Sequence, residues 1–330
     1  MGEWKLAGVT RSLSKSRQFG MAALVTMGVV TGCVGATGNH ARGDVKASTV
    51  SSACQPKSAI PPGNVTDFYD RRVLSYAPVM YLTMAHHAKG SETDLSGHGH
   101  TGTYLPAGQL PGGTALPNGD QVTLFNGRGQ YLEVPSASSL SVPATGCLTV
   151  QAWVRPDVLQ FPEEEGSGYV YILGKGASSQ QEYALRMYSQ TNKENPERPN
   201  RVSAYVFNPR GGMGSGAYFQ DKVQAHAWMM VTFVIDDQPS PAWPDGYVAI
   251  YKGAQLRGQV SISQFNVTPQ AGDAPFRVAT RQGNSFFKGA IGKVAVFDYA
   301  LSAQQVGSIY NAMPHLAGTG SSRAASRSAR

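Results

Sequence analysis

Charged residues are scarce in this sequence: lysine, arginine, aspartate and glutamate together make up 15% of its 330 residues. It contains only three cysteines, and no apolar run is long enough to cross a bilayer as a helix. The formal net charge of +7 lies at the ends, because the first 32 residues carry +3 and the last 16 carry another +3. About +1 remains for the body of the chain, which gives no support to nucleic-acid binding.

Motifs of several enzyme classes are also absent. No Gly-x-Ser-x-Gly elbow occurs, and the glycine-rich run 211–216 lacks the lysine of a phosphate-binding loop. The consecutive acids at 163–165 would be split between the two faces of a strand, so we interpret them as a solvated loop. His98 and His100 have a spacing that would suit a metal site, but the glycines beside them make an imprecise scaffold. The sequence therefore does not support catalysis.

The stretch 148–156, Leu-Thr-Val-Gln-Ala-Trp-Val-Arg-Pro, gives a clear local signal of secondary structure. Its alternation predicts a half-buried strand, because successive strand side chains point to opposite faces. Trp153 falls on the otherwise polar face, which indicates that a second layer covers that face as well. Pro156 lacks an amide donor and is expected to end the strand.

The rest of the chain has the pattern of an all-β protein, with 38 glycines and 20 prolines to form turns. The run 126–129, Asn-Gly-Arg-Gly, predicts a hairpin. Ser302 predicts the N-cap of a helix over 302–313, since a glutamine follows three residues later. Many short strands and almost no helix indicate an antiparallel two-sheet jelly-roll sandwich. Further strands are predicted over 78–84, 122–125, 131–134, 169–173, 183–188, 202–207, 228–235, 247–251, 276–279 and 291–297.

The N-terminal residues 1–32 have the features of a signal peptide, with a basic start followed by the apolar run 21–30. The run ends in Val30-Thr31-Gly32-Cys33, which resembles the bacterial lipobox. The resemblance implies that Cys33 is lipidated and becomes the mature N-terminus. We therefore expect an exported protein, either lipid-anchored at the cell envelope or extracellular.

Residues 33–65 are rich in Ala, Gly, Ser, Thr and Pro, which predicts a flexible linker, and the basic tail 315–330 is expected to be disordered. If Cys33 carries lipid, Cys54 and Cys147 remain as an even pair in an oxidising compartment. They could form a disulfide that ties the linker to the strand at 148–156. The alternative, two unpaired cysteines with Cys147 buried, stays open.

Eight segments, taken in order, carry a family pattern: 78–82, 94–97, 125–127, 131–135, 148–156, 172–175, 226–228 and 289–302. Together they resemble the laminin-G-like, concanavalin A-like jelly roll of bacterial secreted proteins. The resemblance covers residues 66–314 and implies an antiparallel two-sheet sandwich with a short C-terminal helix. Binding modules and enzymes share this fold. Retaining glucanases of the fold resemble one another in a Glu-x-Asp-x-Glu strand, which sets two carboxylates about 5 Å apart, and no such triplet exists here.

Calcium is the one cofactor that the resemblance raises. Family members often have Ile-Asp-Glu-Val in the last strand, with that aspartate near the ion where calcium binds. Here Gly292 supplies no carboxylate and Lys293 brings a positive charge, although Asp94 is present in its turn. Because calcium needs several oxygen ligands, we expect tight binding to be lost.

Aromatic side chains on loops are the candidate ligand contacts, because a sugar's apolar face stacks on a ring while polar neighbours bind its hydroxyls. Trp153 and Trp228 are expected in the core, and Trp4 lies in the signal peptide, which leaves Trp243 as the loop tryptophan. The other candidates, from two further loops, are Tyr218, Phe219, Arg281 and Phe286.

These features favour a non-catalytic surface module that binds a glycan or a surface protein and attaches to the membrane through its lipid. Two alternatives stay open. One is a polysaccharide-active enzyme with an unrecognised site, for example a lyase that uses Tyr, His and Arg. The other is a structural protein of the envelope with no ligand.

Overall fold

Sixteen β-strands and two short α-helices make up the part of the chain that the computed structural model describes, residues 54–314. The helices are α1 (Phe68–Leu74) and α2 (Ala303–Asn311). The strands are β1 (Met80–Leu82), β2 (Ser91–Glu92), β3 (Gly102–Leu105), β4 (Gly112–Ala115), β5 (Gln121–Asn126), β6 (Tyr131–Val134), β7 (Cys147–Pro156), β8 (Tyr169–Lys175), β9 (Tyr183–Tyr188), β10 (Val202–Val206), β11 (Ser215–Tyr218), β12 (Met229–Asp236), β13 (Tyr247–Lys252), β14 (Gln255–Ser261), β15 (Phe276–Val278) and β16 (Lys288–Phe297).

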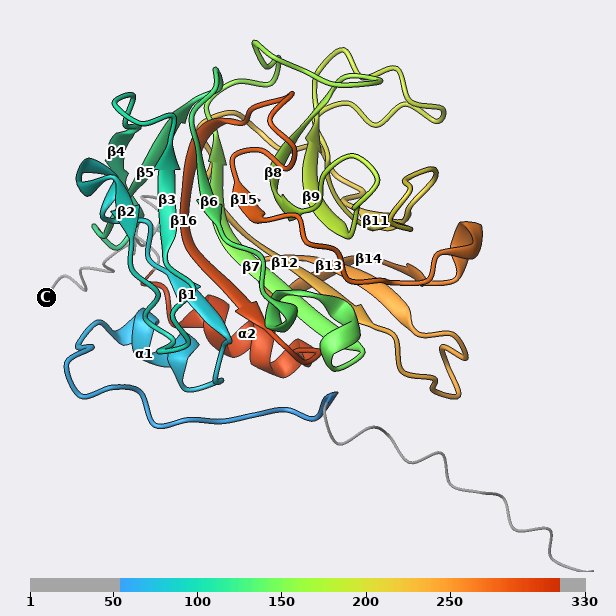
Figure 1. The fold of residues 1–330 in the computed structure, drawn as a ribbon, viewed down its shortest axis with the longest axis horizontal. Coiled ribbons are helices and arrows are strands. Elements are labelled where there is room, and N and C mark those ends of the chain that lie inside the picture. Colours follow the sequence, from blue (N-terminus) through green and yellow to red (C-terminus); the bar gives the residue numbers. More distant parts are fainter. Residues whose placement is uncertain (1–53, 315–330) are drawn as a thin grey trace, which may run out of the picture. The chain divides into compact units, whose positions relative to one another are not determined.

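The strands form two antiparallel sheets of eight strands each (Figure 1). Sheet A has the order β14-β13-β12-β7-β16-β5-β4, with β1 also paired to β16. Sheet B has the order β11-β10-β9-β8-β15-β6-β3-β2. Neighbours that are far apart in sequence, such as β7 and β16, give the crossed connections of a jelly roll, which confirms the predicted fold class.

Strand β7 runs through the middle of sheet A and has both faces covered, as its sequence predicted. Leu148, Val150 and Val154 point into the core between the two sheets. Trp153 points the other way and is buried under the helices, where its indole Nε1 donates a hydrogen bond to the Tyr69 hydroxyl (2.9 Å). Its ring also stacks on Tyr310 of α2, with the ring centroids 6.0 Å apart.

Helices α1 and α2 lie beside each other and cover the outer face of sheet A (Figure 1). The predicted C-terminal helix is confirmed, and Ser302 forms a capping box with Gln305 at its start. Both helices are short, and within residues 54–314 no helix has the length and apolar character that a bilayer crossing requires. The helices therefore cover part of the outer face of sheet A, whereas sheet B has no helical layer among the described residues.

The predicted hairpin at 126–129 is wrong. Strand β5 lies in sheet A and pairs with β4 and β16, while β6 lies in sheet B and pairs with β3 and β15. The turn instead carries the chain from one sheet to the other. Strands β4, β11 and β14 were not predicted, because they are edge segments rich in glycine or polar residues.

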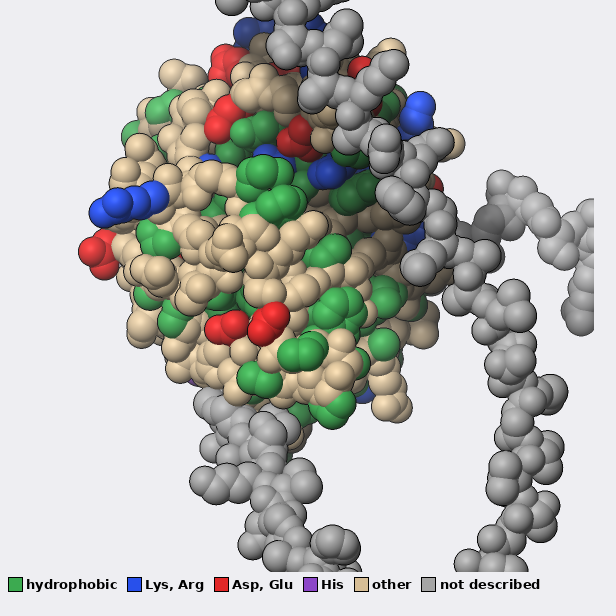
Figure 2. Space-filling view, turned by 90° about the vertical axis from the view of Figure 1, so that its right-hand side faces the viewer, with side chains coloured by type: hydrophobic (Ala, Val, Ile, Leu, Met, Phe, Trp, Pro, Cys, Tyr) green, Lys and Arg blue, Asp and Glu red, His purple; other side chains and the backbone are tan. Residues whose placement is uncertain are grey.

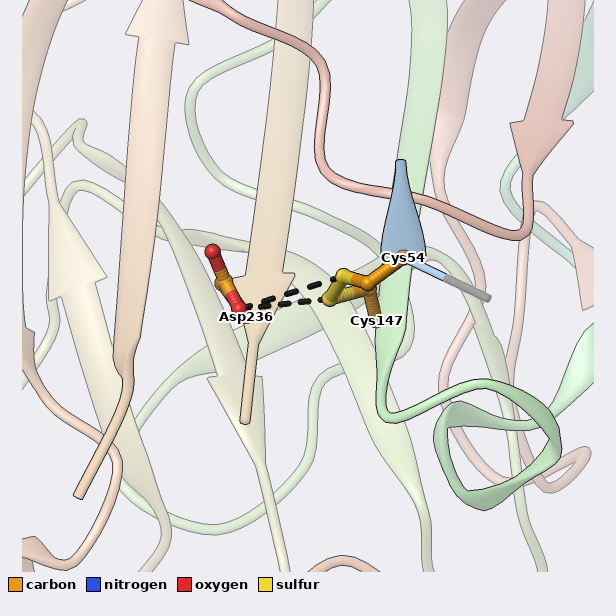
Figure 3. Close-up of side chains that lie close together, drawn as sticks. All are labelled: Cys54, Cys147 and Asp236. Carbon is orange, nitrogen blue, oxygen red and sulfur yellow. Dashed lines mark hydrogen bonds between the residues drawn. A yellow bond between two sulfur atoms is a disulfide. The ribbon is translucent and has the colours of Figure 1, made fainter. Parts of the chain in front are cut away.

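The structure joins Cys54 to Cys147 by a disulfide, with the Cα atoms 5.7 Å apart (Figure 3). Asp236 Oδ1 lies 3.2 Å from the Cys147 sulfur, and partial burial raises the pKa of this carboxyl. Two sulfurs and a carboxylate lie close enough together here to suggest a metal site. They do not form one, because the two sulfurs are already bonded to each other.

The first described residues are packed against the domain rather than free of it. Besides the disulfide at Cys54, the Ala59 amide donates to the Ser75 carbonyl oxygen (3.0 Å), and Val65 is buried. Part of the predicted flexible linker is thus held in place. The predicted signal peptide, Cys33 and the tail 315–330 lie outside the described residues.

Candidate functional site

The outer face of sheet B carries aromatic rings and arginines in place of a helical layer. In β9, Leu185 and Met187 point into the core, so the alternate residues Arg186 and Tyr188 point outward. The same alternation in and just after β10 turns out Tyr205 and Phe207. From β8, Tyr171 belongs to the same cluster on this face and Tyr169 packs against it.

Strand register brings these side chains together. Arg186 lies opposite Tyr171 on one side and Ser203 on the other, and Ser203 in turn lies opposite Tyr218 of the edge strand β11. Tyr205 lies opposite Gly216. A Cβ on Gly216 would come within 2.2 Å of the Tyr205 ring, so the missing side chain makes room for that ring.

Arg186 is held between two tyrosine rings. Its guanidinium carbon is 4.3 Å from the Tyr169 ring centroid and 4.0 Å from that of Tyr205, distances typical of cation–π contacts. Only 7% of the residue is exposed, and its Nε has no hydrogen-bond partner within the described residues. Its Nη2 donates to the Tyr188 hydroxyl (2.9 Å) and, more weakly, to Glu194 (3.4 Å).

A second arginine, Arg198, approaches the same tyrosines from the loop after β9. Its Nη1 donates to the Tyr205 hydroxyl (2.6 Å), and its guanidinium carbon lies 4.3 Å from the Tyr218 ring centroid. It also forms an ion pair with Glu194, at 3.5 Å. Glu194 thus faces two arginines at long distances, and its side chain remains 27% exposed.

Arg281, a third arginine, stacks on Tyr171 (4.3 Å) and Phe207 (5.2 Å) further along the same face. It is 1% exposed, and burial lowers its pKa. No ion pair within 4.0 Å reaches it from residues 54–314; its guanidinium instead donates to the amide oxygens of Gln181 and Gln282. Arginines and rings therefore alternate along the outer face of sheet B.

A groove of about 750 Å³ opens over this face. Its floor is the set of tyrosines and arginines, and its walls are the loops after β9 and β10 together with the short helical turn η5 (Gln264–Asn266). Met213 and Phe265 stand at the groove with 66% and 48% of their surface exposed. The lining residues with polar, charged or aromatic side chains are Ser167, Tyr169, Arg186, Lys193, Glu194, Asn195, Arg198, Tyr205, Phe207, Tyr218, Gln264 and Phe265.

Phe265 is held in an unusual backbone conformation, with φ 61° and ψ 26°. The left-handed region disfavours a bulky residue, at a cost on the order of 1 kcal/mol. The turn is fixed by Asn208, whose amide donates to the Asn266 carbonyl oxygen (3.1 Å) and whose side-chain oxygen accepts from the Thr268 amide (3.0 Å). The turn therefore keeps a half-exposed ring at the groove in spite of backbone strain.

The face toward which β14 and the groove loops extend is shown in Figure 2. Basic, acidic and hydrophobic side chains gather near the top of this view, and the middle of the face carries few charges.

A laminin-G family model, described as the concanavalin A-like lectin/glucanases superfamily, matches residues 126–307, more than half of the chain. The chain belongs to this family. The match includes β8, β9, β10 and β11, the strands that carry the groove. No curated protein matches the chain in sequence.

Solved structures with a similar fold include the binding domain of Paraclostridial Mosquitocidal Protein 1, with a TM-score of 0.51 and 11% identity over 74% of this chain and 52% of that one. Domain 4 of AbnA, an extracellular arabinanase from Geobacillus stearothermophilus solved with arabinotriose, has a TM-score of 0.49 and 16% identity, covering 71% of this chain and 98% of that one. The ligand binding domain of botulinum neurotoxin serotype D, solved with N-acetylneuraminic acid, has a TM-score of 0.48 and 12% identity, covering 71% and 50%. The chain spans about half the length of the first and third, and such low identities show a shared fold alone.

Of the ligand contacts predicted from the sequence of this family member, Tyr218 lines the groove and Arg281 lies beside it. Phe219 does not contribute, because it is fully buried in the core between the sheets and has no surface to offer. Phe286 is also buried and packs against Tyr131. Trp243 is half-buried on a different loop, where it packs against Tyr247 and does not line the groove.

Sequence patterns missed most of the groove. Tyr169, Arg186 and Tyr205 lie within strands, so they were assigned to the fold and not to a site. The signal that could have identified them is their alternation with core residues, which puts an arginine and several tyrosines on one face of adjacent strands. Phe265 gave no signal, because its exposure depends on the turn.

The predicted metal ligand Asp94 is occupied by hydrogen bonds of its own loop. One carboxylate oxygen accepts from the amides of Tyr81 and Ser96 (both 2.9 Å), and the other accepts from the His100 amide (2.9 Å). Asp94 thus has a structural role in this turn, and it belongs to none of the metal-compatible clusters found among residues 54–314. His98 and His100 make their ring contacts to Ser96 and Ser139.

Lys293 points into a different acidic cluster, on the outer face of sheet A. Its ammonium lies 2.6 Å from Asp70 and 2.7 Å from Asp120, and only 3% of its side chain is exposed. Burial disfavours the charge, but the two carboxylates outweigh it and raise the pKa of Lys293. Gly292 beside it has no room for a side chain, since a Cβ would lie 2.2 Å from Val122.

Proposed function

We propose that this protein is a non-catalytic module that binds glycans in the groove on the outer face of sheet B. The observation that carries the proposal is the set of rings and hydrogen-bond donors gathered there, with Phe265 held half-exposed at the edge. Aromatic faces suit the apolar face of a sugar, and the polar side chains between them suit its hydroxyls.

The number of acidic residues that line the groove supports binding over hydrolysis. Glycoside hydrolysis ordinarily uses two carboxyl groups, one on each side of the bond that is cleaved. Glu194 is the one acidic residue among the described residues that line the groove, and it forms ion pairs with both Arg186 and Arg198.

A glycan array, followed by titration of the strongest ligand, tests the proposal. Phe265→Ala removes an exposed platform, so we expect binding at least about tenfold weaker, the equivalent of about 1.4 kcal/mol. Trp243→Ala is the matched control, because Trp243 is an aromatic on a loop outside the groove lining. Binding that is absent from the array, or lost with Trp243→Ala and retained with Phe265→Ala, would contradict the proposal.

A polysaccharide lyase is the second candidate, and the contact between Arg198 and Tyr205 favours it. A phenol that receives a charge-assisted hydrogen bond of 2.6 Å is a group that could exchange a proton with a sugar. Incubation with uronate polysaccharides distinguishes the two functions. The binding module leaves the chain length unchanged, whereas a lyase releases unsaturated oligosaccharides.

We further propose that the protein is exported and anchored by lipid at Cys33. The disulfide between Cys54 and Cys147 supports an oxidising compartment. Cys33→Ser should move the protein from the membrane fraction to the soluble fraction, because removing the lipidated residue removes the anchor. An unchanged membrane fraction would rule out this anchor.

A further inference from the structure

We propose that the groove selects acidic glycans, with a ligand carboxylate or sulfate bound beside Arg186 and Arg198 in the place that Glu194 now partly occupies. This inference rests on the proposed glycan-binding function and adds the chemical class of the ligand. Nothing in the fold itself requires an anion, so the case depends on the charges and distances in this groove.

The charge of the lining is the first support. Three cationic side chains, Arg186, Lys193 and Arg198, face the groove, and Glu194 is the one described acid among them. A groove that binds neutral sugars needs hydroxyl partners but no surplus of positive charge. An excess of cations, with Arg186 largely buried, favours an anionic ligand, because charged hydrogen bonds are stronger away from bulk water.

The second support is that the two arginines have unused hydrogen-bonding capacity. Arg186 Nε and Arg198 Nε are buried without a partner within residues 54–314. A buried donor with no acceptor costs about 1–3 kcal/mol. A guanidinium presents five donors in a planar fork that matches the two oxygens of a carboxylate or sulfate, and the terminal nitrogens that Glu194 contacts are the ones such a group would bind.

The third support is the geometry of Glu194. It reaches Arg186 at 3.4 Å and Arg198 at 3.5 Å, longer than the 2.7–2.9 Å typical of charged hydrogen bonds. It lies on the loop after β9, with 27% of its side chain exposed. Glu194 therefore holds the arginines loosely and marks where an anion sits. A ligand anion would compete with it for the two guanidinium groups.

Matched ligand pairs test the inference with the full-length protein. Oligogalacturonate and its methyl ester differ in the carboxylate charge, and dextran sulfate and dextran differ in the sulfate. We expect the acidic member of at least one pair to bind at least about tenfold more tightly than its neutral partner, with the difference reduced by added salt. Comparing the two pairs distinguishes a carboxylate from a sulfate as the preferred anion.

Two variants with opposite expected effects on affinity for the acidic ligand keep the test independent of folding. Arg198→Gln should weaken binding of the acidic ligand about tenfold or more and weaken the neutral ligand by less, so that the ratio of the two affinities falls. Glu194→Gln is isosteric and removes the competing carboxylate, so affinity for the acidic ligand should rise several-fold. A variant that merely unfolded could not bind more tightly. Thermal melts of both variants check that they are folded.

The possible outcomes separate the inference of an acidic ligand from the proposed glycan-binding function. Equal binding of acidic and neutral members overturns the inference and leaves the glycan-binding function standing. A loss of acidic binding in Glu194→Gln also overturns the inference. If no member of either pair and no glycan on the array binds, the proposed function fails and the inference fails with it.

Discussion

At the scale of single residues, two glycines at the edge strand β11 decide the shape of the groove floor. A Cβ on Gly216 would meet the Tyr205 ring at 2.2 Å, and a Cβ on Gly214 would meet the Phe207 ring at 2.6 Å. Both rings stack on each other, with centroids 5.8 Å apart. The absence of side chains at these positions is therefore what allows the rings to lie flat along the sheet.

Gly216→Ala should displace the Tyr205 ring and thereby disturb the stacking on Arg186. We expect glycan affinity to fall at least about tenfold, and overpacking to lower the free energy of unfolding by about 1–3 kcal/mol. Gly307→Ala is the matched control: it lies within α2, where the nearest atom to a new Cβ is at 3.8 Å. That change should raise stability by about 0.5–1 kcal/mol and leave binding unchanged. Calorimetric titration and denaturant melts measure both.

Asp237 gives a prediction about how the stability of the protein depends on pH. Partial burial, together with the charge of Asp236, raises its pKa to about 6 from the usual value of 3.8. The folded state then binds more protons than the unfolded state between these two values, so this group makes stability fall as pH rises through them. Asp237→Asn should therefore stabilise the protein near pH 7 and have little effect near pH 4. Thermal melts across this range measure the difference; a gain that is constant with pH would show that the charge is not the cause.

At the scale of elements, strand β16 is irregular at Gly292 and Lys293. Its register with β7 shifts between Gly292 and Ala295, and Lys293 sits in this irregularity with φ 54°. The bulge turns the lysine outward to Asp70 of α1 and to Asp120. An internal ammonium thus ties the first helix to sheet A, where a side chain at Gly292 would not fit.

Lys293→Met should be strongly destabilising, because it leaves Asp70 buried without its counter-charge. Breaking a buried pair in this way typically costs about 3–5 kcal/mol. Denaturant melts of the variant and the unaltered protein measure the loss, and a variant of unchanged stability would show that the pair contributes nothing.

Calcium should leave the stability of the unaltered protein unchanged. We expect the same melting temperature with a chelator and with millimolar calcium, since an ion far below its dissociation constant adds little to the folded state. A large upward shift with calcium would mean that other oxygens form a site.

Local patterns predicted the strands well where residues of the inter-sheet core alternate with residues that face the other way, as in β7 and β9, and predicted the capped helix α2. They failed where pairing partners matter. The Asn-Gly-Arg-Gly turn has the composition of a hairpin, yet the core residues on its two sides belong to different sheets. Edge strands such as β11 and β14 were missed because edge positions tolerate glycine and polar residues.

At the scale of the whole molecule, the position of the groove follows from which sheet faces are covered by helices or by the other sheet. The helices cover part of the outer face of sheet A, and the two inner faces bury each other, whereas loops frame the outer face of sheet B. Sequence alone predicted the sandwich and two members of the aromatic and basic set, Tyr218 and Arg281. The groove itself depends on which strands are neighbours, and that long-range register is not encoded in any single segment.

A crystal structure with an acidic oligosaccharide tests the central claim, binding in the groove, most directly. The account predicts electron density for the sugar over the outer face of sheet B, with its acidic group within hydrogen-bond distance of Arg186 or Arg198 and a ring face against Phe265 or Tyr218. Density at another place, such as the loop of Trp243, with the sheet B groove empty, would contradict it.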